Sequence, residues 1–168
     1  MVNVYKDVVT DHELVSDSYK IEKKYEDCAL FVKSAYIEVN DDCGIANNDE
    51  EGGGLEEGPK RVNNIVHHFN LTQTQYKKPE YMTWVKAYMK RILDRIKEKC
   101  PDREPIFKTN AQAFVKYIIE QFDNCDFYIN NDNNEEGMVV PAIWTNSESG
   151  DEGPTFVYFA DGLRVEKY

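Results

Sequence analysis

The segment from Lys77 to Lys99 combines a helical pattern of apolar residues with a basic charge. Its large apolar side chains recur every three or four residues, the spacing that places them on one face of an α-helix. They are Tyr81, Trp84, Tyr88, Ile92 and Ile96. Proline suits the first turn of a helix but cannot continue its hydrogen bonding. We therefore expect a helix that begins near Lys78 or Pro79 and ends at Pro101.

This predicted helix is basic, although the protein as a whole is acidic. The segment holds eight Lys and Arg residues against three Asp and Glu residues, whereas the formal net charge of the chain is -11. A helix that buries one face and presents a basic face to water is suited to an acidic partner. The alternative is a solvated face whose charges pair within the helix, for example Lys90 and Arg95 with Asp94 and Glu98.

A second helix is predicted by another apolar stripe, which consists of Ala111, Phe114, Val115, Ile118 and Phe122. We expect it to run from Thr109 or Asn110, either of which can cap it, to Asp123. The short Pro101–Phe107 link then makes the two helices an antiparallel hairpin over about 78–123.

The remaining periodic segments have strand character. Before the hairpin they are Val2–Val9, Ser18–Lys23, Cys28–Val39 and Arg61–Leu71. After it they are Phe127–Ile129, Met138–Thr145, Thr155–Ala160 and Leu163–Lys167. Asp161-Gly162 predicts a two-residue hairpin turn in which glycine supplies a positive φ. Strands, a helical hairpin and more strands indicate a single α+β domain over 1–168.

Residues 40–60 are glycine-rich and acidic, a composition that predicts a mobile surface loop. Its carboxylates are candidate calcium ligands, above all Asp41, Asp42, Asp49, Glu50 and Glu51. Because a flexible loop supplies charge without a shaped cage, we expect an affinity of only about 0.1–1 mM. No other cofactor is expected.

Several classes of function are disfavoured. A pI near 4.7 argues against nucleic-acid binding. His12, His67 and His68 belong to no recognisable catalytic or metal motif, so we do not expect an enzyme. The chain shows neither a signal-peptide pattern nor a run of about 18 apolar residues, so we expect a cytoplasmic protein without membrane contact. The four cysteines form no CxxC pair and are expected to be reduced.

Groups of residues along nearly the whole chain resemble the translationally controlled tumour protein family. The N-terminal groups are Tyr5-Lys6-Asp7, Glu13, Ser16-Asp17, Ile65-Val66, Leu71, Thr74 and Tyr76. Those of the hairpin are Lys78, Tyr81, Trp84-Val85-Lys86, Tyr88-Met89-Lys90, Pro101-Asp102-Arg103, Phe107 and Thr109. The C-terminal groups are Phe122, Phe127-Tyr128, Gly137-Met138-Val139, Asp161-Gly162-Leu163 and Glu166-Lys167. Their order and spacing together make the resemblance specific.

The resemblance implies a twisted, tent-like β core similar to a Rab accessory factor, with a projecting helical hairpin and a mobile acidic loop. It also implies a non-enzymatic adaptor, linked to growth and survival, that binds calcium, tubulin and anti-apoptotic proteins. On this hairpin the tubulin contacts would be Lys86, Lys90, Arg91, Arg95 and Lys97. A second implied activity is nucleotide exchange on a small GTPase of the Rheb type, with Glu13 and Leu71 on one β surface. A stress chaperone is a third hypothesis, and release from cells without a signal peptide stays open.

The sequence departs from the family pattern at three places. Ile45-Ala46-Asn47-Asn48 replaces the usual Ile-Gly-Gly-Asn, and Asn130-Asn131 replaces a Gly-Glu pair, which removes a carboxylate. Many members end in a cysteine that can form a disulfide dimer, but this chain ends in Tyr168, so we expect a monomer.

Overall fold

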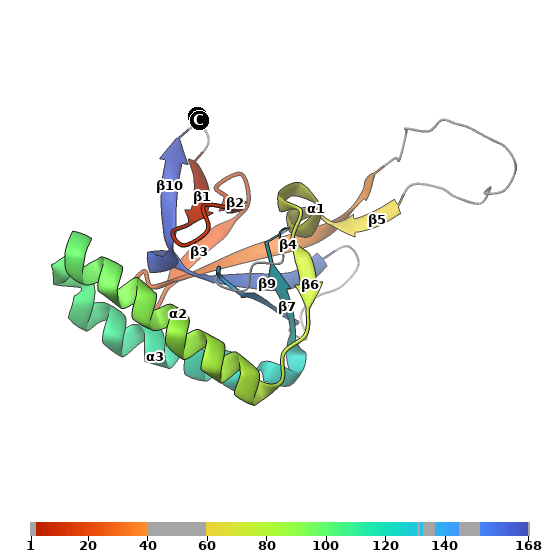
Figure 1. The fold of residues 1–168 in the computed structure, drawn as a ribbon. Helices are drawn as coiled ribbons and strands as arrows, with labels where there is room; N and C mark the ends of the chain where they lie inside the picture. Colours follow the sequence, from red (N-terminus) through yellow and green to blue (C-terminus); the bar gives the residue numbers. More distant parts are fainter. Residues whose placement is uncertain (1–2, 40–59, 131, 133–136, 145–151, 168) are drawn as a thin grey trace, which may run out of the picture.

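The computed structural model describes residues 3–39, 60–130, 132, 137–144 and 152–167. Two antiparallel sheets and a long helical hairpin make up this part of the chain (Figure 1). The larger sheet has the strand order β3 (Ile21–Lys24), β4 (Ala29–Val39), β9 (Glu152–Phe159), β8 (Val140–Ile143), β7 (Cys125–Ile129) and β6 (Thr72–Thr74). The end of β4 also pairs with β5 (Lys60–Asn63). The smaller sheet has the order β10 (Leu163–Lys167), β1 (Asn3–Asp7) and β2 (Glu13–Ser16).

The helices lie in the middle of the sequence, as the α+β prediction requires. The hairpin consists of α2 (Lys78–Lys99) and α3 (Glu104–Glu120), and a short helix, α1 (Asn64–Phe69), precedes it. Both hairpin helices run along one side of the β core (Figure 1). The predicted fold class is therefore confirmed. The sequence pattern missed strand β2, which is only four residues long.

Helix α2 matches its prediction closely. Pro79 lies in its first turn, and the Glu80 carboxylate accepts a hydrogen bond from the Lys77 backbone N–H at 2.8 Å. Four of the five predicted stripe residues are buried, together with Val85. Trp84 is half-buried instead, and its ring stacks on Tyr88 with the ring centroids 4.9 Å apart.

The predicted start of the second helix is wrong. Helix α3 begins at Glu104, five residues before Thr109, and ends at Glu120. Pro105 falls in its first turn, where the missing N–H costs nothing, and buried Phe107 extends the apolar stripe by one turn. The link between the helices is thus only Cys100 and a 3-10 turn, Pro101–Arg103.

The strand predicted over Arg61–Leu71 is also wrong beyond Asn63. There the chain turns into α1, because the Asn63 side chain accepts hydrogen bonds from the backbone N–H groups of Ile65 and Val66 at 3.0 and 3.2 Å. Asn70 ends the helix in the left-handed conformation, with φ 55°. His67 and His68 are consequently both exposed on a helix.

Asp161-Gly162 does not form the predicted hairpin turn. Ala160–Gly162 is a 3-10 turn that carries the chain out of the larger sheet, and β10 then pairs with β1 in the smaller one. Gly162 does not adopt the expected positive φ. Its role is close packing, because a Cβ at this position would lie 2.7 Å from Tyr88 Oη and 2.9 Å from Met138 Cε.

One hydrophobic core is shared by the two sheets and the hairpin. Phe114 of α3, for example, packs edge-on against Phe159 of β9 at a centroid distance of 5.0 Å, and Tyr81 of α2 packs on Phe127 of β7 at 5.1 Å. None of the helices in the described ranges is long and apolar enough to cross a membrane. The predicted acidic loop lies outside the described residues except for Lys60, as do all five calcium candidates.

Candidate functional site

The five cations predicted to bind tubulin do not share one face of α2. At 3.6 residues per turn, Lys86, Lys90 and Lys97 fall within about 40° of one another around the helix axis. Arg91 and Arg95 lie on average about 140° away from them. The structure therefore separates the predicted set into a lysine group and an arginine group.

An acidic stripe lies between these two groups. Glu80, Asp94 and Glu98 are all exposed and fall between the lysines and the arginines around the helix. The intrahelical ion pairs predicted for Asp94 and Glu98 are not formed within the described part of the chain. The lysines face α3, because Lys97 Nζ lies 4.0 Å from a carboxylate oxygen of Glu104. Arg91 is on the other side, near Tyr88. Burial and the Asp7 carboxylate raise the pKa of Tyr88, and the charge of Arg91 opposes this shift in part.

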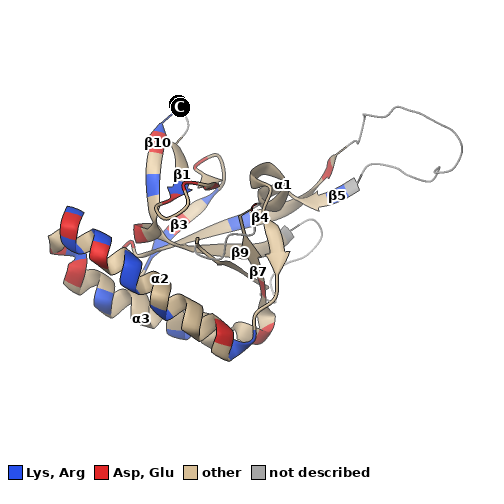
Figure 2. Ribbon diagram, in the orientation of Figure 1, with Lys and Arg blue, Asp and Glu red and all other residues tan. Residues whose placement is uncertain are grey.

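Charge is strongly segregated between the hairpin and the rest of the protein. Residues 77–120 contain 11 Lys and Arg against 6 Asp and Glu, whereas the remaining sequence contains 9 against 25. Basic residues are present on both hairpin helices (Figure 2). The hairpin is thus a cationic element on an anionic protein, and it can attract an acidic partner that the rest of the surface repels.

The hairpin is fixed to the β core by buried and half-buried polar contacts. Arg103, at the turn between the helices, donates two hydrogen bonds to Asp161, from Nε at 2.8 Å and from Nη2 at 3.0 Å. This pairing raises the pKa of Arg103. Nη2 also lies 3.3 Å from the buried thiol of Cys28, whose pKa is raised to about 11 by burial and by Asp161. A thiol in this state is a poor nucleophile, so Cys28 is a structural residue.

A second candidate site is a cleft of about 270 Å³ between the β1–β2 loop, α1 and the end of β7. Residues far apart in the sequence line it: Asp11, His12, Glu13, His68, Phe69, Asn70 and Asn130. Glu13 lines the cleft as part of the predicted GTPase surface. Leu71 is not among the lining residues and is only 7% exposed. No pattern in the sequence predicts that His12, His68 and Asn130 meet here.

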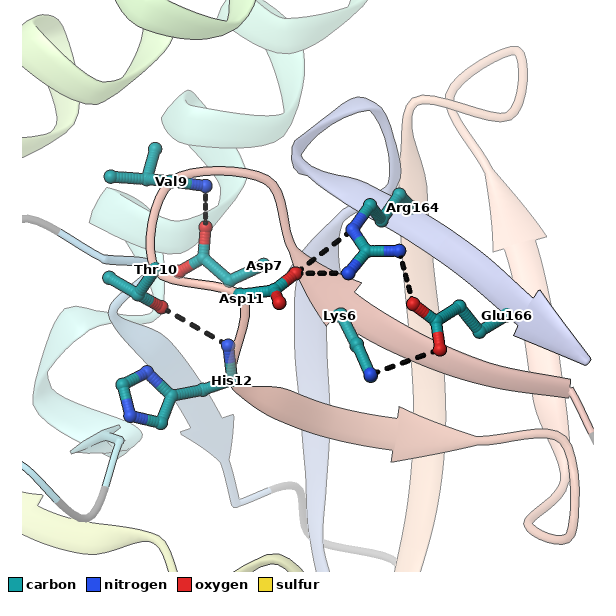
Figure 3. Close-up of polar contacts among 8 residues, drawn as sticks. All are labelled: Lys6, Asp7, Val9, Thr10, Asp11, His12, Arg164 and Glu166. Carbon is teal, nitrogen blue, oxygen red and sulfur yellow. Dashed lines mark hydrogen bonds and ion pairs between the residues drawn. The ribbon is translucent and has the colours of Figure 1, made fainter. Parts of the chain in front are cut away.

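Asp7 positions the loop that carries Asp11 and His12 and leads into β2 (Figure 3). Its side chain is only 1% exposed. One carboxylate oxygen accepts hydrogen bonds from Val9 N–H at 2.9 Å and from the Tyr88 hydroxyl of α2 at 3.0 Å, and the other accepts from Met138 N–H at 2.5 Å. A single buried carboxylate therefore joins the β1–β2 loop, the hairpin and the segment that leads into β8.

Ion pairs engage most of the charged groups around the cleft. Arg164 bonds both Asp11 and Glu166, and Lys6 Nζ lies 3.1 Å from Glu166 (Figure 3). His12 Nε2 lies 2.8 Å from an Asp132 oxygen. Glu13 is exposed and forms no ion pair within the described ranges, so its charge is available to a partner.

The two histidines of the cleft have separate partners. His12 contacts Asp132, whereas His68 Nδ1 lies 2.7 Å from the Tyr19 hydroxyl. Among the residues that the structure describes, no three His, Cys, Asp or Glu side chains are grouped so that they could hold a metal ion.

Comparison with known proteins identifies the family. The family model for translationally controlled tumour protein matches residues 2–164. Translationally-controlled tumor protein homologs from Plasmodium chabaudi chabaudi and Schizosaccharomyces pombe are 40% and 38% identical, over 99% and 98% of this chain and 100% and 99% of theirs. The solved structure of the translationally controlled tumor-associated protein p23fyp from S. pombe superposes with a TM-score of 0.79 at 35% identity, over 100% of both chains. The translationally-controlled tumor protein of Caenorhabditis elegans has the same fold, with a TM-score of 0.69 at 21% identity over 100% of this chain and 99% of that one. The chain therefore belongs to the translationally controlled tumour protein family.

Proposed function

We propose that this protein is a cytoplasmic, non-enzymatic adaptor that binds tubulin polymers through its helical hairpin. The observation that carries the proposal is the segregation of charge, a cationic hairpin on a strongly anionic protein. Tubulin exposes acidic tails, so attraction to the hairpin and repulsion from the rest of the surface would orient the complex. Exposed charges are screened by salt, so this binding should weaken steeply as ionic strength rises.

Charge reversal of the lysine group tests this proposal. In co-sedimentation with polymerised tubulin at low salt, we expect Lys86→Glu/Lys90→Glu/Lys97→Glu to lose at least about tenfold in affinity, because three attractive contacts become repulsive. The matched control is Lys20→Glu/Lys23→Glu/Lys33→Glu, which makes the same change in net charge at three exposed residues of the β core. The control should retain most of the binding. The proposal fails if the wild type does not sediment with the polymer at low salt, or if both variants lose binding equally.

A second candidate function is binding of a small GTPase of the Rheb type at the cleft. The observation that favours it is the exposed Glu13 carboxylate, which lines the cleft without an ion pair in the described structure. Leu71, the other residue predicted for this surface, is buried and does not line the cleft, so its role as a contact stays a prediction from the sequence.

The Glu13→Val variant tests this second function. In a pull-down with the nucleotide-free GTPase, we expect it to lose about five- to tenfold in affinity, because hydrogen bonds to a charged group are among the stronger polar contacts. Glu22→Val replaces another exposed carboxylate, on β3, and should bind like the wild type. The tubulin interaction should be unchanged in both variants. Equal binding by the Glu13 and Glu22 variants would remove Glu13 from the interface.

The calcium, anti-apoptotic and chaperone hypotheses stay predictions from the sequence. The proposed calcium ligands, Asp41, Asp42, Asp49, Glu50 and Glu51, lie outside the described residues. For a charge-driven adaptor, partner binding should fall with added salt, whereas a chaperone that uses apolar surface should suppress client aggregation at any ionic strength.

A further inference from the structure

Helix α3 adds lysines to the surface that α2 presents. Lys108 and Lys116 of α3 are both exposed, and neither belongs to the predicted tubulin contacts. Lys108 Nζ lies 3.0 Å from the same Glu104 carboxylate oxygen that Lys97 approaches to 4.0 Å. Lysines from the two helices therefore meet at one carboxylate near the hairpin turn.

The packing of α3 shows which of its sides faces α2. Tyr117 contacts the β core, with its ring centroid 5.9 Å from that of Phe31. Glu104 and Lys108 are on the opposite flank of α3, the flank that Lys97 approaches. Because the helices are antiparallel, the contact between Lys97 and Glu104 indicates their register. For ideal helices, this register predicts that Leu93 lies opposite Lys108, and that Lys86, about two turns further along α2, lies at the level of Lys116.

We propose that Lys86, Lys90, Lys97, Lys108 and Lys116, here termed the lysine face, form one binding surface for an extended acidic polypeptide segment. The inference rests on the proposed adaptor function and specifies the chemistry of its partner. Among the described residues of the hairpin, Glu104 is the carboxylate that these lysines contact. Asp94 and Glu120 are exposed one turn from Lys90 and Lys116, so five lysines against three carboxylates leave the surface with a net positive charge. Lys86, Lys90 and Lys116 form no ion pair within the described residues and are available to a partner.

The dimensions of the lysine face suit an extended chain. Lys86 and Lys97 are separated by about 16 Å along the axis of α2. An extended segment of about five residues covers this length. The half-buried Leu93 lies between the lysines and supplies apolar contact in the middle of the surface. Glutamates spaced along such a segment can pair with lysines of both helices, whereas Arg91 and Arg95 lie too far around α2 to take part.

Anisotropy of a fluorescein-labelled peptide of ten glutamates at low salt tests the lysine face. We expect Lys86→Gln/Lys90→Gln and Lys108→Gln/Lys116→Gln each to weaken peptide binding about fivefold, since each removes two exposed charge contacts. Arg91→Gln/Arg95→Gln makes the same change in net charge on the other flank and should change binding less than twofold. Circular dichroism of all three variants confirms that the helices are retained.

The possible outcomes separate the two-helix surface, the acidic partner and the binding of tubulin from one another. If the α3 variant binds the peptide like the arginine variant, the two-helix surface is overturned, although α2 alone can still serve tubulin. If the wild type sediments with tubulin but does not bind the peptide, an extended acidic segment is the wrong partner. If the wild type binds the peptide but not tubulin, the lysine face stands and the tubulin proposal fails.

Discussion

Replacement of Asp7 by asparagine is expected to lower the free energy of unfolding by about 2–4 kcal/mol. The Asp7 carboxylate is buried and accepts hydrogen bonds from the backbone of Val9, the hydroxyl of Tyr88 and the backbone of Met138. Asparagine keeps one acceptor oxygen, but its NH₂ group takes the place of the other. In the wild type that other oxygen lies 2.5 Å from the Met138 backbone nitrogen, so two donors would then face each other. At least one buried donor is left without an acceptor.

Urea denaturation of Asp7→Asn beside Asp94→Asn measures this effect. Asp94 is exposed on α2 and forms no ion pair in the described structure, so the control makes the same chemical change without disturbing a buried contact. Its stability should change by less than about 0.5 kcal/mol. Because Asp7 also fixes the β1–β2 loop, the variant should perturb the NMR signals of His12 and Glu13. Equal stabilities for the two variants would show that the Asp7 hydrogen bonds contribute little.

The hairpin helix α2 could be predicted from the sequence because its formation depends mainly on interactions between residues close together in the chain. The period of α2 depends on residues three and four positions apart, and Pro79 and Pro101 bound the helix with little influence from tertiary contacts. The predicted start of α3 is five residues too late, because a proline such as Pro105 can belong either to a link or to the first turn of a helix. Helix α1 has only six residues, too few for a periodic signal.

The cleft could not be predicted from the spacing of residues in the sequence, for a different reason. Its lining comes from the β1–β2 loop, α1 and the end of β7, and no local spacing brings His12, His68 and Asn130 together. The lysine face, too, is formed by residues that only the tertiary structure brings together. Lys108 and Lys116 join α2 only through the antiparallel register of the hairpin, which depends on how both helices pack on the β core. Charge content was readable in the sequence, but its arrangement was not.

Glycine is required at position 162 for a reason other than the predicted one. A glycine in a turn suggests positive φ, but here the requirement is space. The chain leaves the larger sheet at Gly162 and passes directly over α2. A Cβ would approach Tyr88 Oη to 2.7 Å, Met138 Cε to 2.9 Å and Ile92 Cδ1 to 3.2 Å. Because the Tyr88 hydroxyl is hydrogen-bonded to Asp7, it cannot move aside without cost.

We therefore expect Gly162→Ala to lower the free energy of unfolding by about 3 kcal/mol, through overpacking between the hairpin and the β core. A double-mutant cycle with Tyr88→Phe separates this explanation from a backbone effect. Tyr88→Phe alone should cost about 2 kcal/mol, because the lost hydrogen bond is to the buried Asp7 carboxylate. It also removes the oxygen that the new methyl group meets at 2.7 Å. The double variant should then be about 1 kcal/mol more stable than the sum of the single changes predicts. Strict additivity in urea denaturation would mean that the cost of alanine does not come from Tyr88, and that the close approach at Gly162 is relieved elsewhere.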